Sequence, residues 1–206
     1  MVETLTYLFD QTALRLDGKK AILFMRKGKL ESQITYSSLQ QISNRVANDL
    51  IEMDLKKGDR AILFMPKSME QVVFHLSVQK VGAISVILNP GFKKDEMNYF
   101  LEDTNAKIII VGKKEEPLIR SIDEKRRILS IDTETPFTEE KLFPGYSFQI
   151  VMAEANLHDP ALLIYTSLTF ALSNLIPVTS TLARLAGPLP PIGLAPLLQQ
   201  LVVGVG

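Results

Sequence analysis

The chain has 206 residues, of which 46% are hydrophobic and 22% charged, and this composition suits one or at most two globular domains. Its formal net charge is zero and it has no cysteine, so the composition indicates neither a nucleic-acid partner nor an anionic membrane surface, and it excludes disulfides and thiolate chemistry. Glu3 and Asp10 stand where a signal peptide would carry positive charge and then an apolar run, so we expect a cytoplasmic protein.

The first third of the chain predicts two helices with a hairpin between them. Residues 3–16 and 37–53 show apolar side chains at helical spacing, and Ser37 or Ser38 is the expected N-cap of the second helix. Residues 21–36 form two apolar-rich runs on either side of Lys27 and Gly28, which predicts a β-hairpin. The expected apolar stripes are Leu5, Leu8, Phe9, Thr12 and Leu16 in the first helix, and Leu39, Ile42, Val46, Leu50 and Met53 in the second.

Strands and helices alternate in the middle of the chain. Short apolar runs separated by amphipathic segments predict an α/β fold, a mostly parallel sheet flanked by helices with right-handed crossovers. The predicted strands are residues 60–66, 82–90, 106–112 and 126–132, and the predicted helices are 68–80, 93–105 and 115–124. Residues 133–156 are expected to be irregular, and 161–166 to form one more buried strand. We expect the side chains of Lys56, Lys57, Lys93 and Lys94 to be exposed, and those of nine strand residues to be buried: Ile62, Leu63, Phe64, Val86, Ile87, Leu88, Ile108, Ile109 and Ile110.

Few residues carry an evident chemical signal. The chain has two histidines, and both predict structural roles: His75 within a helix, and His158 in a solvated turn before Asp159 and Pro160. The sequence contains no HExxH, GxSxG, GxGxxG or GxxxxGK[ST] motif. The residues alone therefore indicate no catalytic group and no metal site.

Four segments together resemble a known family. They are ITYSSLQQISNRVANDL, LKKGDRAILFMPKSMEQVVFHLSVQKVGAISVILNP, DEMNYFLEDTNAKIIIV and DPALLIYTS. In this order and spacing they resemble the N-terminal region of the adenylate-forming acyl-CoA synthetases, the AMP-binding superfamily. The resemblance covers residues 34–167 and extends back to residue 1. It implies a parent reaction in which an acid, ATP and coenzyme A give an acyl-CoA, AMP and pyrophosphate, with ATP, Mg and coenzyme A as the parent family's cofactors and reactants.

The resemblance breaks down inside the family's phosphate loop. That loop follows its Tyr-Thr-Ser with Gly-Thr-Thr-Gly-x-Pro-Lys-Gly, whose glycines let backbone N–H groups approach phosphate and whose lysine offsets charge. Residues that match are Tyr165, Thr166, Ser167 and Thr169, a remnant of a nucleotide-phosphate site. Residues that depart from the motif are Leu168, Phe170, Ala171 and the run Ser173, Asn174, Leu175. We therefore expect a truncated ligase with no catalytic residue, no metal and no cofactor of its own, inactive as this chain.

The resemblance divides the chain into residues 1–167, a partial acyl-CoA synthetase N-terminal domain, and residues 168–206, an apolar tail unlike the family. Beyond Ser167 the only charged residue is Arg184, and five prolines interrupt the apolar runs, so insertion into a membrane is not expected. The tail is the product of a changed reading frame or was selected to cover an apolar surface. Two other functions stay open: a non-catalytic binding module, which docks a partner or forms a homo-oligomer, and half of a split ligase completed by a C-terminal fragment.

Overall fold

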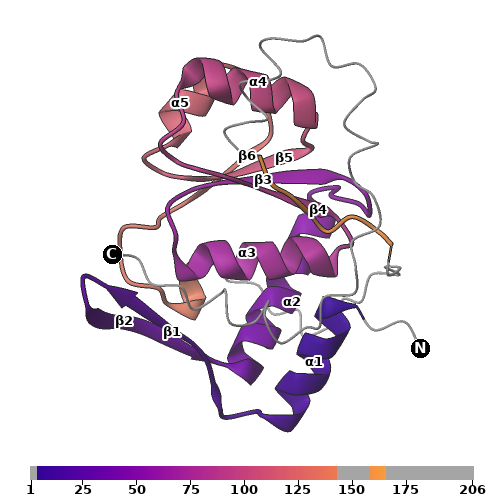
Figure 1. Ribbon diagram of the computed structural model, residues 1–206, viewed down its shortest axis with the longest axis vertical. Helices are drawn as coiled ribbons and strands as arrows, with labels where there is room; N and C mark the ends of the chain where they lie inside the picture. The colour runs from indigo at the N-terminus through magenta and orange to yellow at the C-terminus, as the bar shows by residue number, and fades with distance from the viewer. Residues whose placement is uncertain (1–3, 143–157, 166–206) are drawn as a thin grey trace. The chain divides into compact units, whose positions relative to one another are not determined.

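Five parallel strands lie at the centre of the computed structural model, which describes residues 4–142 and 158–165 (Figure 1). Their order is β6-β5-β3-β4-β7, and each neighbouring pair runs parallel. The strands are β3 (Arg60–Phe64), β4 (Ile84–Leu88), β5 (Ile108–Gly112), β6 (Ile128–Ile131) and β7 (Leu162–Leu163). The predicted α/β fold with a mostly parallel sheet is confirmed.

Helices cover both faces of this sheet (Figure 1). On one face lies α3 (Met69–Lys80), with α2 (Tyr36–Glu52) and α1 (Leu5–Arg15) packed beneath it. On the other face lie α4 (Lys94–Thr104) and α5 (Glu116–Arg120). Apart from these helices, a short 3₁₀ helix spans Glu139–Lys141. The predicted residues of β3, β4 and β5 are buried, apart from a half-buried Ile87, and the four lysines expected in solvent are exposed; the centre of β6 is only partly buried. Among these helices, none in residues 4–142 and 158–165 is long and apolar enough to cross a membrane.

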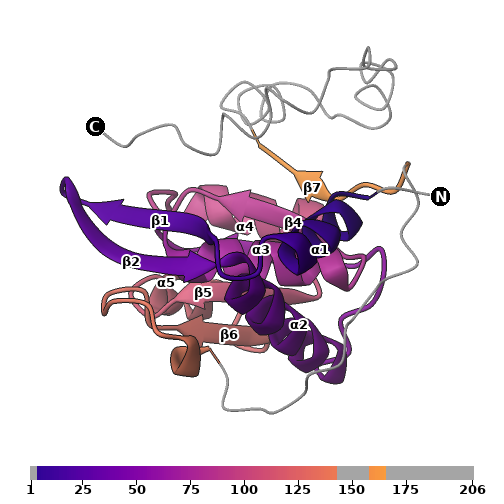
Figure 2. The same ribbon diagram turned by 90° about the horizontal axis from the view of Figure 1, so that it is seen from below.

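The predicted hairpin consists of β1 (Lys20–Arg26) and β2 (Lys29–Thr35), which pair antiparallel and extend beyond the helices (Figure 2). Lys27 and Gly28 both have positive φ, 50° and 73°. A two-residue loop with two positive φ angles is the type I′ turn, whose twist matches that of the flanking strands. The hairpin therefore has the turn chemistry that its sequence predicts.

Helix starts follow the side chains that can accept backbone N–H groups. Ser68 is the N-cap of α3, and its hydroxyl accepts a bond from Gln71 N, as the sequence predicts. The predicted N-cap of α2 is wrong: Thr35, not Ser37 or Ser38, caps the helix and accepts from Ser38 N at 3.1 Å. Ser37 lies inside the first turn, where its hydroxyl donates to the Asp17 carbonyl.

Two other predictions need correction. Helix α5 ends at Arg120 rather than at residue 124, because the Asp123 side chain accepts from Lys125 N and turns the chain. Strand β7 is not buried: it is an edge strand of two residues, and Leu162, Leu163 and Ile164 are 41%, 37% and 64% exposed.

An ion pair that the sequence pattern does not reveal ties α1 to the other helices. Leu5, which belongs to the predicted apolar stripe of α1, is half exposed, whereas Asp10, which does not, is buried. The face of α1 that packs on the protein therefore coincides only in part with the predicted stripe. The fully buried Lys80 Nζ donates to Asp10 Oδ1 at 2.6 Å and to Asn44 Oδ1 at 2.6 Å. Gln40 donates to the same Asp10 oxygen at 3.1 Å, and the ammonium lies 5.6 Å from the Phe9 ring centroid. Burial lowers the pKa of Lys80, and the Asp10 carboxylate opposes that shift.

Candidate phosphate site at the sheet edge

The last described segment of the chain ends at the carboxyl edge of the parallel sheet. Leu162 and Leu163 of β7 pair with Ser85 and Val86 of β4, and Ser85 N donates to the Ala161 carbonyl at 3.1 Å. Tyr165 follows this strand by two residues, so it emerges where the other parallel strands also end. Open α/β sheets bind ligands at this edge, outside the carboxyl ends of their strands.

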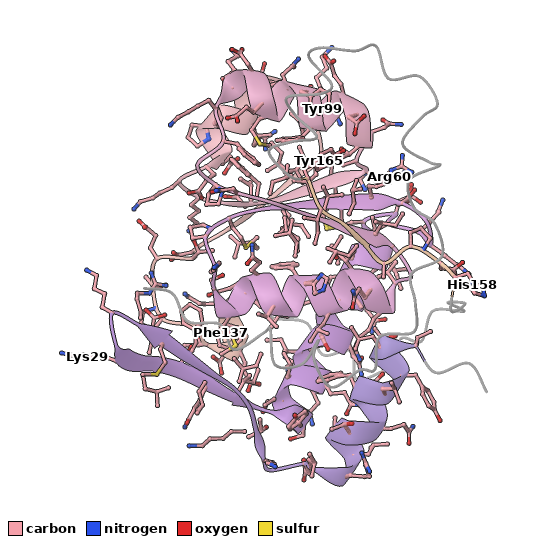
Figure 3. The ribbon with its side chains drawn as sticks, viewed as in Figure 1. Lys29, Arg60, Tyr99, Phe137, His158 and Tyr165 are labelled. Atoms are coloured by element: carbon pink, nitrogen blue, oxygen red, sulfur yellow. The ribbon has the colours of Figure 1, made fainter. Side chains whose placement is uncertain are left out.

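Tyr165 is fixed against α4. Its hydroxyl donates to Asp103 Oδ2, and its ring centroid lies 4.6 Å from Phe100 and 6.4 Å from Tyr99 (Figure 3). Burial raises the pKa of Tyr165 well above its usual value, and the bond to the Asp103 carboxylate raises it further. The phenol is therefore a protonated donor at neutral pH, and it anchors the residue that precedes the predicted loop.

The same segment is held at its beginning by an ion pair. Asp159 Oδ2 lies 2.9 Å from Lys57 Nζ, which belongs to the turn before β3. Residues 159–165 are thus tied to three other parts of the fold: the turn before β3, the edge of β4 and helix α4. Three of the four resembling segments supply residues 159–165 and these parts, so the geometry explains why those three occur together.

The structure places one of the four predicted site residues. Thr166, Ser167 and Thr169 lie outside the described residues, and only Tyr165 can be located. Sequence reasoning missed the partners of Tyr165 on α4. Tyr99 and Asp103 are four residues apart and share one face of α4, but this spacing does not indicate that Tyr165 packs there.

A carboxylate, and not a cationic cradle, occupies the carboxyl ends of β5 and β6. Glu115 Oε2 is buried without a hydrogen-bond partner, and a Cβ at Gly112 would lie 2.1 Å from it. Burial raises the pKa of Glu115. Lys114 forms an exposed ion pair with Glu134, which offsets its charge. This arrangement offers little attraction to phosphate.

Other candidate sites in the described part of the chain are weak. His158 is exposed, as predicted, and His75 is largely buried in α3 with Nδ1 unpaired, so burial lowers the pKa of His75. No group of three His, Cys, Asp or Glu side chains within residues 4–142 and 158–165 could hold a metal ion. A cavity of about 190 Å³ lies elsewhere, between the hairpin and the start of α2, and it is smaller than the pockets of about 300 Å³ or more that hold drug-sized ligands.

Comparison with known proteins gives a consistent result. The family model for AMP-binding enzymes matches residues 9–169. The long-chain-fatty-acid–CoA ligase FadD13 of Mycobacterium tuberculosis is 32% identical over 90 residues, which are 44% of this chain and 18% of that protein. Surfactin synthase subunit 2 of Bacillus subtilis is 31% identical over 105 residues, which are 51% of this chain and 3% of that protein.

A solved structure shares the fold. The N-terminal domain of FACL13 from Mycobacterium tuberculosis superposes with a TM-score of 0.69 at 23% identity, over 80% of this chain and 42% of that one. The chain spans less than half the length of each of these proteins.

Proposed function

The chain belongs to the family of AMP-binding enzymes, and from that premise we propose that it supplies the N-terminal α/β scaffold of an ATP-dependent ligase that joins carboxylic or fatty acids to coenzyme A. The FadD13 match, to a long-chain-fatty-acid–CoA ligase, supports this substrate class. The parent reaction consumes the acid, ATP and coenzyme A and releases AMP and pyrophosphate. Mg and ATP would be held by parts of the parent enzyme that have no counterpart in this sequence.

The anchored Tyr165 is the observation that carries this proposal. Its bond to Asp103 and its tilted ring contact with Phe100 hold Tyr165 at the carboxyl edge of the sheet, which supports a loop that begins there as the family's phosphate loop begins. The three glycines that should follow are replaced by Leu168, Ala171 and Leu175, the second threonine by Phe170 and the lysine by Asn174. We infer that the scaffold is retained while the phosphate cradle is lost, so the chain by itself does not form an acyl-adenylate.

Exchange of pyrophosphate into ATP tests this proposal. Adenylation needs preorganised donors and cations around the transferring group, and loss of one such donor commonly costs about 10² to 10³ in rate. Because this chain lacks several of them together, purified protein should give no acid-dependent exchange above a no-enzyme control. Exchange that requires a fatty acid and persists through repurification would contradict the proposal.

A second candidate function, half of a split ligase, is favoured by the exposed edge of the sheet. β7 pairs with β4 on one side, and among the described strands none pairs with its other side. Leu162 and Leu163 of β7 and the following Ile164 are partly exposed apolar residues, a surface suited to another chain. Exchange activity that appears only when a C-terminal ligase fragment is added would establish this function. A stoichiometric complex without turnover would instead favour the non-catalytic module. The cytoplasmic location and the homo-oligomer predicted from the sequence stay predictions.

A further inference from the structure

The β1–β2 hairpin has an inner face that packs and an outer face that does not. Ile22 and Phe24 pack against the hydrophobic core. Leu23 and Met25 alternate with Ile22 and Phe24 along β1, and the side chains of Leu23, Met25 and Leu30 are 55%, 54% and 52% exposed. Met25 lies directly opposite Leu30 across the strands, so their side chains share one face. Large exposed apolar side chains gathered on one face mark an interaction surface.

Positive charge is concentrated on the hairpin that carries this outer face, with Arg26 on the inner side, 5.8 Å from the Phe24 ring centroid. Residues 19–31 contain five basic residues and one acidic residue, a net charge of +4 in a chain whose total is zero. The acidic residue, Glu31, lies 2.6 Å from Arg26, and among the residues that the structure describes no carboxylate forms an ion pair with the lysines of this segment. Figure 3 shows Lys29 at the outer end of the hairpin, directed away from the body of the protein. The basic residues are Lys19, Lys20, Arg26, Lys27 and Lys29, and all are exposed.

We propose that the outer face of this hairpin docks on an anionic lipid surface, with Leu23, Met25 and Leu30 entering the headgroup boundary and the lysines reaching lipid phosphates. Basic residues combined with a few large apolar ones are the pattern of proteins that lie in a membrane interface. Long lysine stems can follow apolar surface while the ammonium reaches the phosphate layer. A cluster of exposed cations beside an apolar face suits a lipid surface better than an uncharged protein groove.

Co-sedimentation with vesicles tests the charge contribution. The full chain should bind phosphatidylcholine vesicles that contain phosphatidylglycerol more tightly than pure phosphatidylcholine vesicles, and the difference should vanish in about 1 M salt, where the screening length is about 3 Å. The variant Lys27→Asn/Lys29→Gln should bind the anionic vesicles about 25-fold more weakly, because each basic residue near such a surface contributes about a factor of five. Asn suits position 27 because it tolerates the positive φ there.

The matched control removes the same charge elsewhere. Lys67→Gln/Lys125→Gln alters two exposed lysines outside the hairpin and should leave binding to anionic vesicles within about twofold of the unmodified chain, since the charge removed is not on the docking face. An equal loss in both double variants would mean that only total charge matters, and it would overturn the proposal.

The contribution of the apolar side chains to vesicle binding is tested by co-sedimentation of a second pair of variants. Met25→Ser/Leu30→Ser should weaken binding at least tenfold, whereas Leu14→Ser/Ile51→Ser, which removes two exposed apolar side chains from α1 and α2, should not. All four positions are exposed, so a far-UV spectrum like that of the unmodified chain is expected and confirms folding. Binding that ignores lipid charge and every hairpin change would contradict docking by this face. So would capture of acidic proteins in preference to anionic vesicles.

Discussion

Replacing Asp10 by alanine should destabilise the fold far more than its position near the N-terminus suggests. Lys80 Nζ is fully buried and has Asp10 as its ion-pair partner at 2.6 Å, with the neutral Asn44 as its other close contact. Removing one partner of a buried ion pair leaves a charge uncompensated, at a cost of about 3 to 5 kcal/mol. With a urea dependence of about 2 kcal/mol per molar, the unfolding midpoint should fall by about 2 M.

Urea unfolding followed by circular dichroism measures this effect, and Glu134→Ala is the matched control. Glu134 also pairs with a lysine, Lys114, but both side chains are more than half exposed, so the midpoint should scarcely move. The double variant Asp10→Leu/Lys80→Met removes both charges and should recover much of the loss, even if Asp10→Ala alone fails to fold. A midpoint for Asp10→Ala equal to that of the control would show that Lys80 is solvated and refute the reasoning.

Two further predictions concern pH and association. Because the pKa of His75 is lowered in the folded state, the unfolded chain binds more protons just below pH 6.5, so stability should decrease as pH falls through that range. His75→Gln should reduce the dependence of the unfolding free energy on pH, measured by urea titration at several pH values. His158→Gln, at an exposed site, should leave that dependence unchanged. The exposed edge at β7 should make the chain associate in sedimentation, and Leu162→Ser/Ile164→Ser should shift it toward monomer. A monomer before any substitution would contradict that expectation.

The central sheet was predictable because its sequence pattern is unambiguous. Runs such as Ile108 to Val111 are apolar on both faces and separated by helical segments, and buried parallel strands have this pattern. Periodicity did less well at the helix termini and in α1. Thr35, Ser37 and Ser38 can all cap a helix, and only the backbone conformation decides among them.

The features that the sequence pattern did not predict depend on contacts between residues far apart in the chain. Asp10 and Lys80 are 70 residues apart, so nothing local in the sequence indicates that they pair. The depth of β7 was mispredicted because apolar composition does not distinguish an edge strand from a central one. For the candidate site, the resemblance identified Tyr165, but its tie to Asp103 depends on how α4 packs beside the end of the sheet.

Direct measurement of ATP binding tests most closely whether this chain has lost the family's phosphate site. Equilibrium dialysis of the full chain against labelled ATP with magnesium reports on the phosphate cradle without requiring turnover or an acid substrate. We expect no saturable binding of ATP, because Leu168, Phe170 and Ala171 replace the residues that would hold phosphate. Saturable binding that is lost in Thr166→Ala/Ser167→Ala would contradict it and show that this chain builds a working phosphate site.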